Sequence, residues 1–77
     1  MKIKIICSGA IGVEGVDEDG YLEVGKLATV ASILRRVKAD WKLKIFIPIL
    51  VNGEKAGKLQ RLKDGDQVTL FVPMAGG

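Results

Sequence analysis

The sequence predicts an α+β fold in which one main helix packs on a mixed sheet of four to five strands. Two segments, residues 3–7 and 67–72, largely alternate in hydrophobicity as half-buried strands do. From residue 30, apolar side chains instead recur at helical spacing. Glycine-containing turn signals separate these segments. The 77 residues allow a single domain, predicted over residues 1–77, in the order strand–strand–helix–strand–short segment–strand.

The first strand is predicted at residues 3–7. Ile3, Ile5 and Cys7 share one parity and are expected to face the core, whereas Ile6 has the outward parity. A buried cysteine behaves as a small hydrophobic residue, and the chain contains no histidine that could activate it. We therefore expect a structural role for Cys7.

A long, flexible connection at residues 8–20 is expected to lead into a return strand at residues 21–24. The connection contains four glycines and four acidic residues. Its glycine spacing (GAIGVEG, residues 9–15) matches neither the dinucleotide fingerprint nor the P-loop. The acidic run at residues 17–19 lacks the alternating ligand positions of an EF-hand. We expect a hairpin loop with an acidic turn, without bound phosphate or calcium.

The helix is expected to begin after Thr29, whose hydroxyl can accept a hydrogen bond from the first turn. Its apolar face follows the i, i+3, i+4, i+7 pattern, with Trp41 as a further candidate position. The members of this face are Val30, Ile33, Leu34 and Val37. Arg36 and Lys38 would lie near the C-terminal end of the helix, where its dipole favours cations.

The second half of the chain predicts two more strands. Residues 45–51 are rich in β-branched side chains and predict a well-buried strand, which ends at the Asn-Gly turn signal of residues 52–53. Residues 59–62 are expected to be a short connecting piece. Residues 64–66 predict another turn, since glycine supplies the backbone angles that a tight turn needs. Residues 67–72 then form the final strand.

The composition excludes several classes of active site. One cysteine rules out an internal disulfide framework, and the absence of histidine rules out a multi-ligand zinc site and a Ser-His or Cys-His nucleophile. The carboxylates lie in turns without an evident partner or pocket, and so small a domain has little room for an enclosed site. We therefore expect no metal, no bound cofactor and no enzyme activity of the chain on its own. The function classes that the composition still allows are a carrier protein and a binding module.

The net charge is +3, and the lysines are dispersed among acidic residues. Such a surface is either simply solvated or meets an acidic protein partner by electrostatic steering. Neither a basic stripe nor an aromatic platform is present, so no nucleic-acid partner is expected. No apolar run approaches the roughly 18 residues that cross a membrane, and no targeting segment is recognised. The expected location is the cytoplasm.

An exposed apolar patch is predicted on the outward face of the sheet. In the final strand Val68, Leu70 and Val72 share the inward parity, so Phe71 faces outward, as Ile6 does in the first strand. Exposed apolar patches tend to mark partner surfaces. The alternative is that a second helix or loop covers these side chains, although the sequence offers no obvious cover.

The last residues predict an extended tail. Pro73 ends the sheet ladder because it has no N–H to donate, and a flexible tail is expected over about residues 74–77. Gly76 and Gly77 have no side chain that would obstruct passage along a narrow channel, and the Gly77 carboxylate is unhindered. These properties suit a C-terminus that is the substrate of another enzyme. The alternative is a frayed end without a role.

Residues 64–77 (DGDQVTLFVPMAGG) resemble the C-terminal stretch of the MoaD/ThiS family of ubiquitin-like sulfur carriers. Residues 29–34 (TVASIL) resemble the start of that family's helix, and residues 51–53 (VNG) resemble the end of its mid-chain strand. The resemblance covers the whole chain and implies the β-grasp fold. The connection at residues 8–20 departs from it, because the family leads us to expect a compact hairpin.

The resemblance implies a carrier that acts as a cosubstrate. The Gly77 carboxylate would be adenylated by an E1-like adenylyltransferase, which uses ATP, and then converted to a thiocarboxylate. Gly76 would provide clearance for the tail. The residues expected to contact the partner are Phe71, Pro73, Met74, Ala75 and Ile6. The thiocarboxylate would then donate sulfur to a synthase of cofactor biosynthesis.

Two sulfur acceptors and two other functions remain open at this point. The Phe71-x-Pro73 spacing before the Gly-Gly pair resembles the molybdopterin synthase small subunit, which favours the large subunit of that synthase as the acceptor. The Val-Asn-Gly sequence of residues 51–53 fits the thiamine carrier equally well, with thiazole synthase as the acceptor. Alternatively, the chain is a ubiquitin-like modifier conjugated through Gly77, or a non-covalent module that docks through Phe71.

Overall fold

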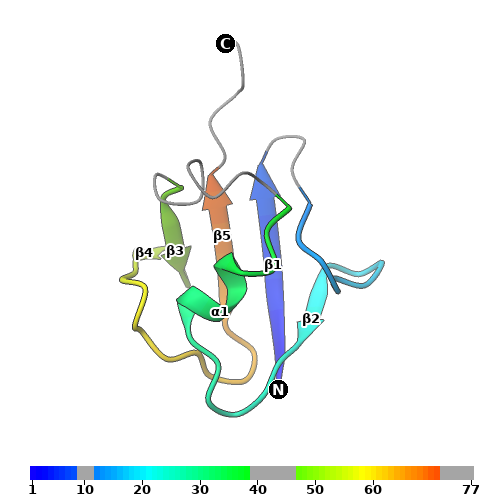
Figure 1. Cartoon of the computed structure of the whole chain (residues 1–77), viewed down its shortest axis with the longest axis horizontal. Coiled ribbons are helices and arrows are strands. Elements are labelled where there is room, and N and C mark those ends of the chain that lie inside the picture. Colours follow the sequence, from blue (N-terminus) through cyan, green and yellow to red (C-terminus); the bar gives the residue numbers. More distant parts are fainter. Residues whose placement is uncertain (9–11, 39–46, 72–77) are drawn as a thin grey trace, which may run out of the picture.

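The fold is a five-stranded mixed sheet with one short helix packed in front of it (Figure 1). The computed structural model describes residues 1–8, 12–38 and 47–71. The strand order is β2-β1-β5-β3-β4; β1 and β5 pair in parallel, and the other neighbours are antiparallel. The elements are β1 (Lys2–Ser8), β2 (Tyr21–Glu23), α1 (Val30–Leu34), β3 (Ile49–Val51), β4 (Glu54–Lys55) and β5 (Gln67–Phe71). The predicted α+β class is confirmed.

The core lies between α1 and one face of the sheet. Alternate residues of β1 and β5 are buried in it, as the period-two pattern predicts. The buried hydrophobic residues are Ile3, Ile5, Leu22, Val30, Ile33, Leu34, Val37, Ile47, Ile49, Val51, Leu62, Val68 and Leu70. Each such side chain contributes roughly 1.5–3 kcal/mol when fully buried, so this single layer is the main source of stability.

The helix begins where the sequence predicts, at an N-cap on Thr29. The Ser32 N–H donates to Thr29 Oγ1 (3.4 Å), and the Thr29 N–H donates back to Ser32 Oγ (3.0 Å). Thr29 itself has extended backbone angles. This reciprocal pair satisfies N–H groups that a helix leaves without partners at its start.

The helix is shorter than predicted, because tertiary pairing replaces its last turns. α1 ends at Leu34, and Val37 instead forms a β-bridge with Val13. The Lys38 N–H donates to the carbonyl oxygen of Gly12 (2.9 Å), so it is not available to continue a helix. Val37 is buried, but its predicted place in the helix is wrong, as is the placing of Arg36 and Lys38 in a last helical turn. Trp41 lies outside the described residues.

The strand predicted at residues 45–51 is also shorter than expected. β3 starts at Ile49, directly after Pro48, which has no N–H for a ladder and precedes the paired residues. Ile47 is buried but not paired in the sheet. Residues 45–46 lie outside the described part of the chain.

Two of the predicted turns are confirmed, and one of them closes a hairpin that the sequence analysis missed. Asn52 and Gly53 have φ angles of 53° and 83°, which suit a two-residue turn between antiparallel strands. That turn joins β3 to β4, a strand of only two residues. Gly65, with φ of 85°, forms the turn at residues 64–66.

The described part of the first connection, residues 12–20, is held by hydrogen bonds and does not have the loose character predicted for it. Asp17 Oδ1 accepts from the N–H groups of Asp19 (2.9 Å) and Tyr21 (2.8 Å). The Glu14 N–H donates to the carbonyl oxygen of Arg36 (2.7 Å). The acidic turn thus uses its carboxylate to hold its own backbone, and no metal-binding cluster occurs among the described residues.

Replacing the capping hydroxyl should destabilise the domain. We expect Thr29→Ala to lower the free energy of unfolding by about 1 kcal/mol, since the Ser32 N–H loses its side-chain acceptor and keeps only the Thr29 carbonyl oxygen. Thr29→Ser keeps the hydroxyl and should remain close to the wild type. Urea denaturation of the three proteins measures the difference; equal midpoints for Thr29→Ala and the wild type would contradict the role of the cap.

Candidate functional site

An apolar patch crosses three strands on the face of the sheet opposite α1. Ile6 and Phe71 are 40% and 46% exposed, and this exposure confirms the outward direction predicted for both. The register pairs Ile6 with Thr69 of β5, and Thr69 with Leu50 of β3. Paired residues point to the same face of a sheet, so Leu50 joins the other two. We call Ile6, Leu50 and Phe71 the outer patch.

The β5 backbone places Phe71 at the end of the outer patch that leads towards residue 77. The register pairs Phe71 with Ser8, and its N–H donates to the carbonyl oxygen of Pro48 (3.2 Å). The Phe71 backbone is therefore held by β1 on one side and by the residue before β3 on the other. Because Ile6 precedes Ser8 by two residues, the side chains of Ile6 and Phe71 are diagonal neighbours on one face.

Cationic side chains flank the outer patch across the sheet. On one side, the Lys4 Nζ lies 4.8 Å from the centre of the Tyr21 ring and donates to the carbonyl oxygen of Asp19 (2.6 Å). On the other side, Lys55 of β4 pairs with Leu50. An apolar centre with charged borders is the usual anatomy of a protein-binding surface.

Cys7 is half-buried and packs against the core, broadly as its inward parity predicts. Desolvation by burial raises the pKa of its thiol. The thiolate, which is the nucleophilic form, is therefore disfavoured. Both observations support a structural role.

The structure brings together only some of the residues that the sequence singled out. Ile6 and Phe71 meet in the outer patch, whereas Pro73, Met74, Ala75, Gly76 and Gly77 lie outside the described residues. Gly77 follows Phe71 by six residues. An extended chain spans at most about 3.3–3.6 Å per residue, so Gly77 can lie no more than roughly 22 Å from Phe71.

Sequence reasoning missed Leu50 as a member of the outer patch. The prediction of a well-buried strand at residues 45–51 names no outward position. The signal was nevertheless available, because Leu50 alternates with Ile49 and Val51, both of which are buried. Thr69, between Ile6 and Leu50, completes the row.

Comparison with known proteins gives a family and a fold. A model of the ThiS family matches residues 13–77. The crystal structure of SAMP1 from Haloferax volcanii superimposes with a TM-score of 0.68 at 24% sequence identity, over 100% of both chains. This likeness confirms the β-grasp fold. No curated protein matches the chain. Within the described ranges, no helix has the length and apolar character needed to span a membrane.

The two faces of β5 should respond differently to truncation. Leu70→Ala removes a side chain with 0% exposure and should cost about 2–5 kcal/mol of folding free energy. Phe71→Ala, on the outward face, should cost less than about 1 kcal/mol. Urea denaturation of both variants checks this, and a larger loss for Phe71→Ala would mean that Phe71 is part of the core.

Cys7 should be alkylated by iodoacetamide more slowly in the folded protein than in urea. Because burial raises its pKa, the pH midpoint of the reaction should also lie higher in the folded state. The folded protein favours the protonated thiol, so Cys7 contributes to folding stability at a pH below the pKa of the thiol in the unfolded chain. This contribution is lost as the pH rises through the higher pKa of the thiol in the folded protein. Mass spectrometry of the alkylated fraction against pH measures both midpoints; identical midpoints would refute the desolvation.

Proposed function

Because the chain belongs to the ThiS family of ubiquitin-like carriers, we propose that it carries sulfur as a thiocarboxylate on Gly77. Members of this family are small carrier proteins rather than enzymes. On this proposal the Gly77 carboxylate is the reacting group, and a partner of the E1-like adenylating class supplies the catalytic machinery. The folded domain presents the carboxylate to that partner.

The outer patch is the observation that carries the proposal. It combines two partly exposed apolar side chains, Ile6 and Phe71, with Leu50 on a rigid sheet. The six residues that follow Phe71 limit the distance between Gly77 and this end of the patch to about 22 Å. A partner that binds the outer patch therefore keeps the carboxylate within a limited distance of the binding surface. This lowers the entropic cost of bringing the carboxylate to the partner's active site.

The proposed chemistry starts at a group that is unreactive by itself. An oxygen of the Gly77 carboxylate attacks the α-phosphorus of ATP, and pyrophosphate leaves. The product is a mixed anhydride with AMP, so the carbonyl carbon becomes an electrophile. Hydrosulfide then attacks this carbon, and AMP leaves with the electron pair of the broken C–O bond. A thiocarboxylate on Gly77 remains after loss of the proton.

The chain's own side chains leave this chemistry to the partner. Cys7 is half-buried with a raised pKa, and the sequence contains no histidine that could act as a general base. The adenylating partner would bind ATP, and this chain would bind no cofactor. Gly76 contributes by lacking a side chain, which allows the tail to enter a narrow channel.

The sulfur acceptor would be an enzyme of cofactor biosynthesis. The Phe71-x-Pro73 spacing favours the large subunit of molybdopterin synthase, and thiazole synthase is the competing acceptor. Incubating the thiocarboxylated chain with each acceptor and its precursor substrate distinguishes them. The true acceptor returns the chain to its carboxylate mass.

Intact mass spectrometry of the chain isolated from its native host tests the proposal. A species about 16 Da heavier, in which sulfur replaces one oxygen, should be present and should disappear when Gly77 is deleted. Its persistence after the deletion would refute the assignment to Gly77. Conjugates that survive denaturant and reductant, without the heavier species, would instead identify a protein modifier.

The outer patch should be required for this modification. Phe71→Asp places a charge in the patch and should reduce the heavier species by at least about tenfold. Leu27→Asp is the matched control, because Leu27 is 71% exposed in the β2–α1 connection at the opposite end of the sheet (Figure 1). Circular dichroism verifies that both variants fold. Equal thiocarboxylation of the two variants would exclude the outer patch as the partner surface.

A further inference from the structure

A second surface, on the α1 side of the sheet, carries an apolar cavity of about 160 Å³. It lies between α1 and the chain around β3 and β4, and its lining includes Val30, Leu34, Ile47, Ile49, Ala56 and Lys58. An apolar cavity of about 150 Å³ is large enough to bind benzene. This cavity therefore has room for one leucine or phenylalanine side chain.

Cationic side chains predominate in the segments that line the cavity, although Glu54 of β4 directly precedes Lys55. Residues 24–38 contain four cationic side chains and no carboxylate, and residues 55–63 contain another four and again no carboxylate. Hydrogen bonds join the two segments: the Ala31 N–H donates to Lys58 O (2.9 Å), and the Val30 N–H donates to Gln60 O (3.0 Å). These bonds place Lys58 next to α1, whereas Arg36 and Lys38 lie against residues 12–15 of the first connection.

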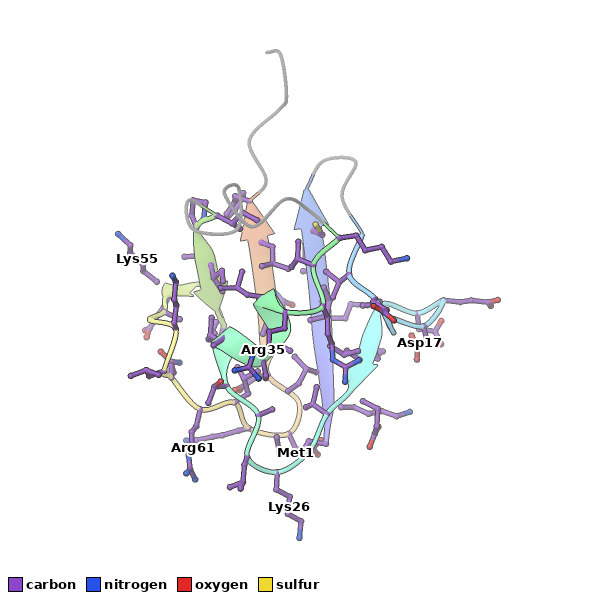
Figure 2. All side chains as sticks on the ribbon, in the orientation of Figure 1. Met1, Asp17, Lys26, Arg35, Lys55 and Arg61 are labelled. Atoms are coloured by element: carbon purple, nitrogen blue, oxygen red, sulfur yellow. The ribbon has the colours of Figure 1, made fainter. Side chains whose placement is uncertain are left out.

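Among the described residues, no carboxylate forms an ion pair with these cations. The ion pair found there joins the Met1 amino group to Glu23. Figure 2 shows Arg35, Arg61 and Lys26 on the α1 side and its lower edge, well away from Asp17 beside β2. The described residues outside the two segments carry eight carboxylates against Lys2 and Lys4. The charges are therefore unevenly distributed: cations predominate in residues 24–38 and 55–63, and carboxylates predominate in the other described residues.

Two features indicate a protein partner rather than a nucleic acid. Leu59, next to Lys58, is 87% exposed, so apolar surface extends beyond the cavity itself. The described aromatic side chains, Tyr21 and Phe71, lie on β2 and β5 and offer no base-stacking platform here. A phosphate backbone would also leave the apolar cavity unfilled.

We propose that this surface docks an acidic segment of a partner protein through one bulky apolar residue. The leucine or phenylalanine of that segment fills the cavity, and its flanking aspartates and glutamates face the surrounding cations, including Lys58. The site is separate from the outer patch, which lies on the other face of the sheet, so both can be occupied at once. The inference does not depend on sulfur transfer.

Fluorescence anisotropy tests the docking with a labelled synthetic peptide in which one phenylalanine is flanked on both sides by aspartate and glutamate. Exchanging that phenylalanine for alanine should weaken binding by about tenfold or more, because the cavity then stays empty. In the protein, Lys58→Glu should weaken binding by about tenfold. Lys2→Glu makes the same change of net charge away from the cavity and should weaken it less than about twofold.

A cavity-filling variant separates the apolar contact from the charge. Ala56→Leu should bind the phenylalanine and alanine peptides equally, and urea denaturation shows whether it folds. In the wild type, ¹⁵N shift changes should appear at Val30, Leu34 and residues 56–58. Equal effects of Lys58→Glu and Lys2→Glu, or equal binding of both peptides to the wild type, would overturn the proposal. Tighter, competing binding of a single-stranded oligonucleotide or an anionic vesicle would overturn the choice of partner.

Discussion

The parallel pairing of β1 with β5 is the constraint on which the rest of the molecule depends. These are the first and last strands of the described chain, and the others are added at their outer edges: β2 on β1, then β3 and β4 beyond β5. Two parallel strands cannot be joined by a tight turn. All the residues between them therefore form one crossover, which carries α1 across a face of the sheet. Pairing between strands so distant in sequence also slows folding, because the entropy of loop closure is lost before the stabilising contacts form.

The turn at residues 64–66 fixes the register between β1 and β5 at the point where the two strands begin. The Lys2 N–H donates to Asp64 Oδ1 (2.8 Å), the Gly65 N–H donates to Lys2 O (2.9 Å), and the Lys4 N–H donates to Asp66 O (2.9 Å). Side chains alternate between faces, so a slip by one residue would exchange the core and the outer patch. The turn at residues 64–66 thus helps to determine which side chains face a partner.

Local signals predicted most of this architecture. Alternation in residues 3–7 and 67–72 gave the two central strands and their buried faces, and Thr29 gave the start of α1. Predictions were wrong where a distant segment competes for the same backbone groups. Val37 continues the helical spacing, yet it pairs with Val13, which lies 24 residues earlier. No window of neighbouring residues contains that information.

The candidate site was predictable to the extent that it depends on parity. Ile6 and Phe71 could be assigned to the outward face from alternation alone, but their adjacency requires the parallel register of β1 and β5. The cavity on the α1 side was beyond prediction for a related reason. It is lined by Val30 and Leu34 of α1 and by residues 47–49 and 55–58, which only the folded chain brings together. The dispersed lysines of the sequence likewise become a cationic surface only in three dimensions.

A carrier with these two surfaces meets a physical requirement of its proposed role. An adenylating enzyme and a sulfur acceptor would both have to recognise the same short glycine tail, which offers almost no side chain to bind. Recognition must then come from the folded domain. Because the outer patch ends only six residues before Gly77, partners that act on the Gly77 carboxylate would bind the outer patch one at a time. The α1-side cavity, on the other face, stays accessible meanwhile, so an acidic segment could retain the carrier between two successive encounters.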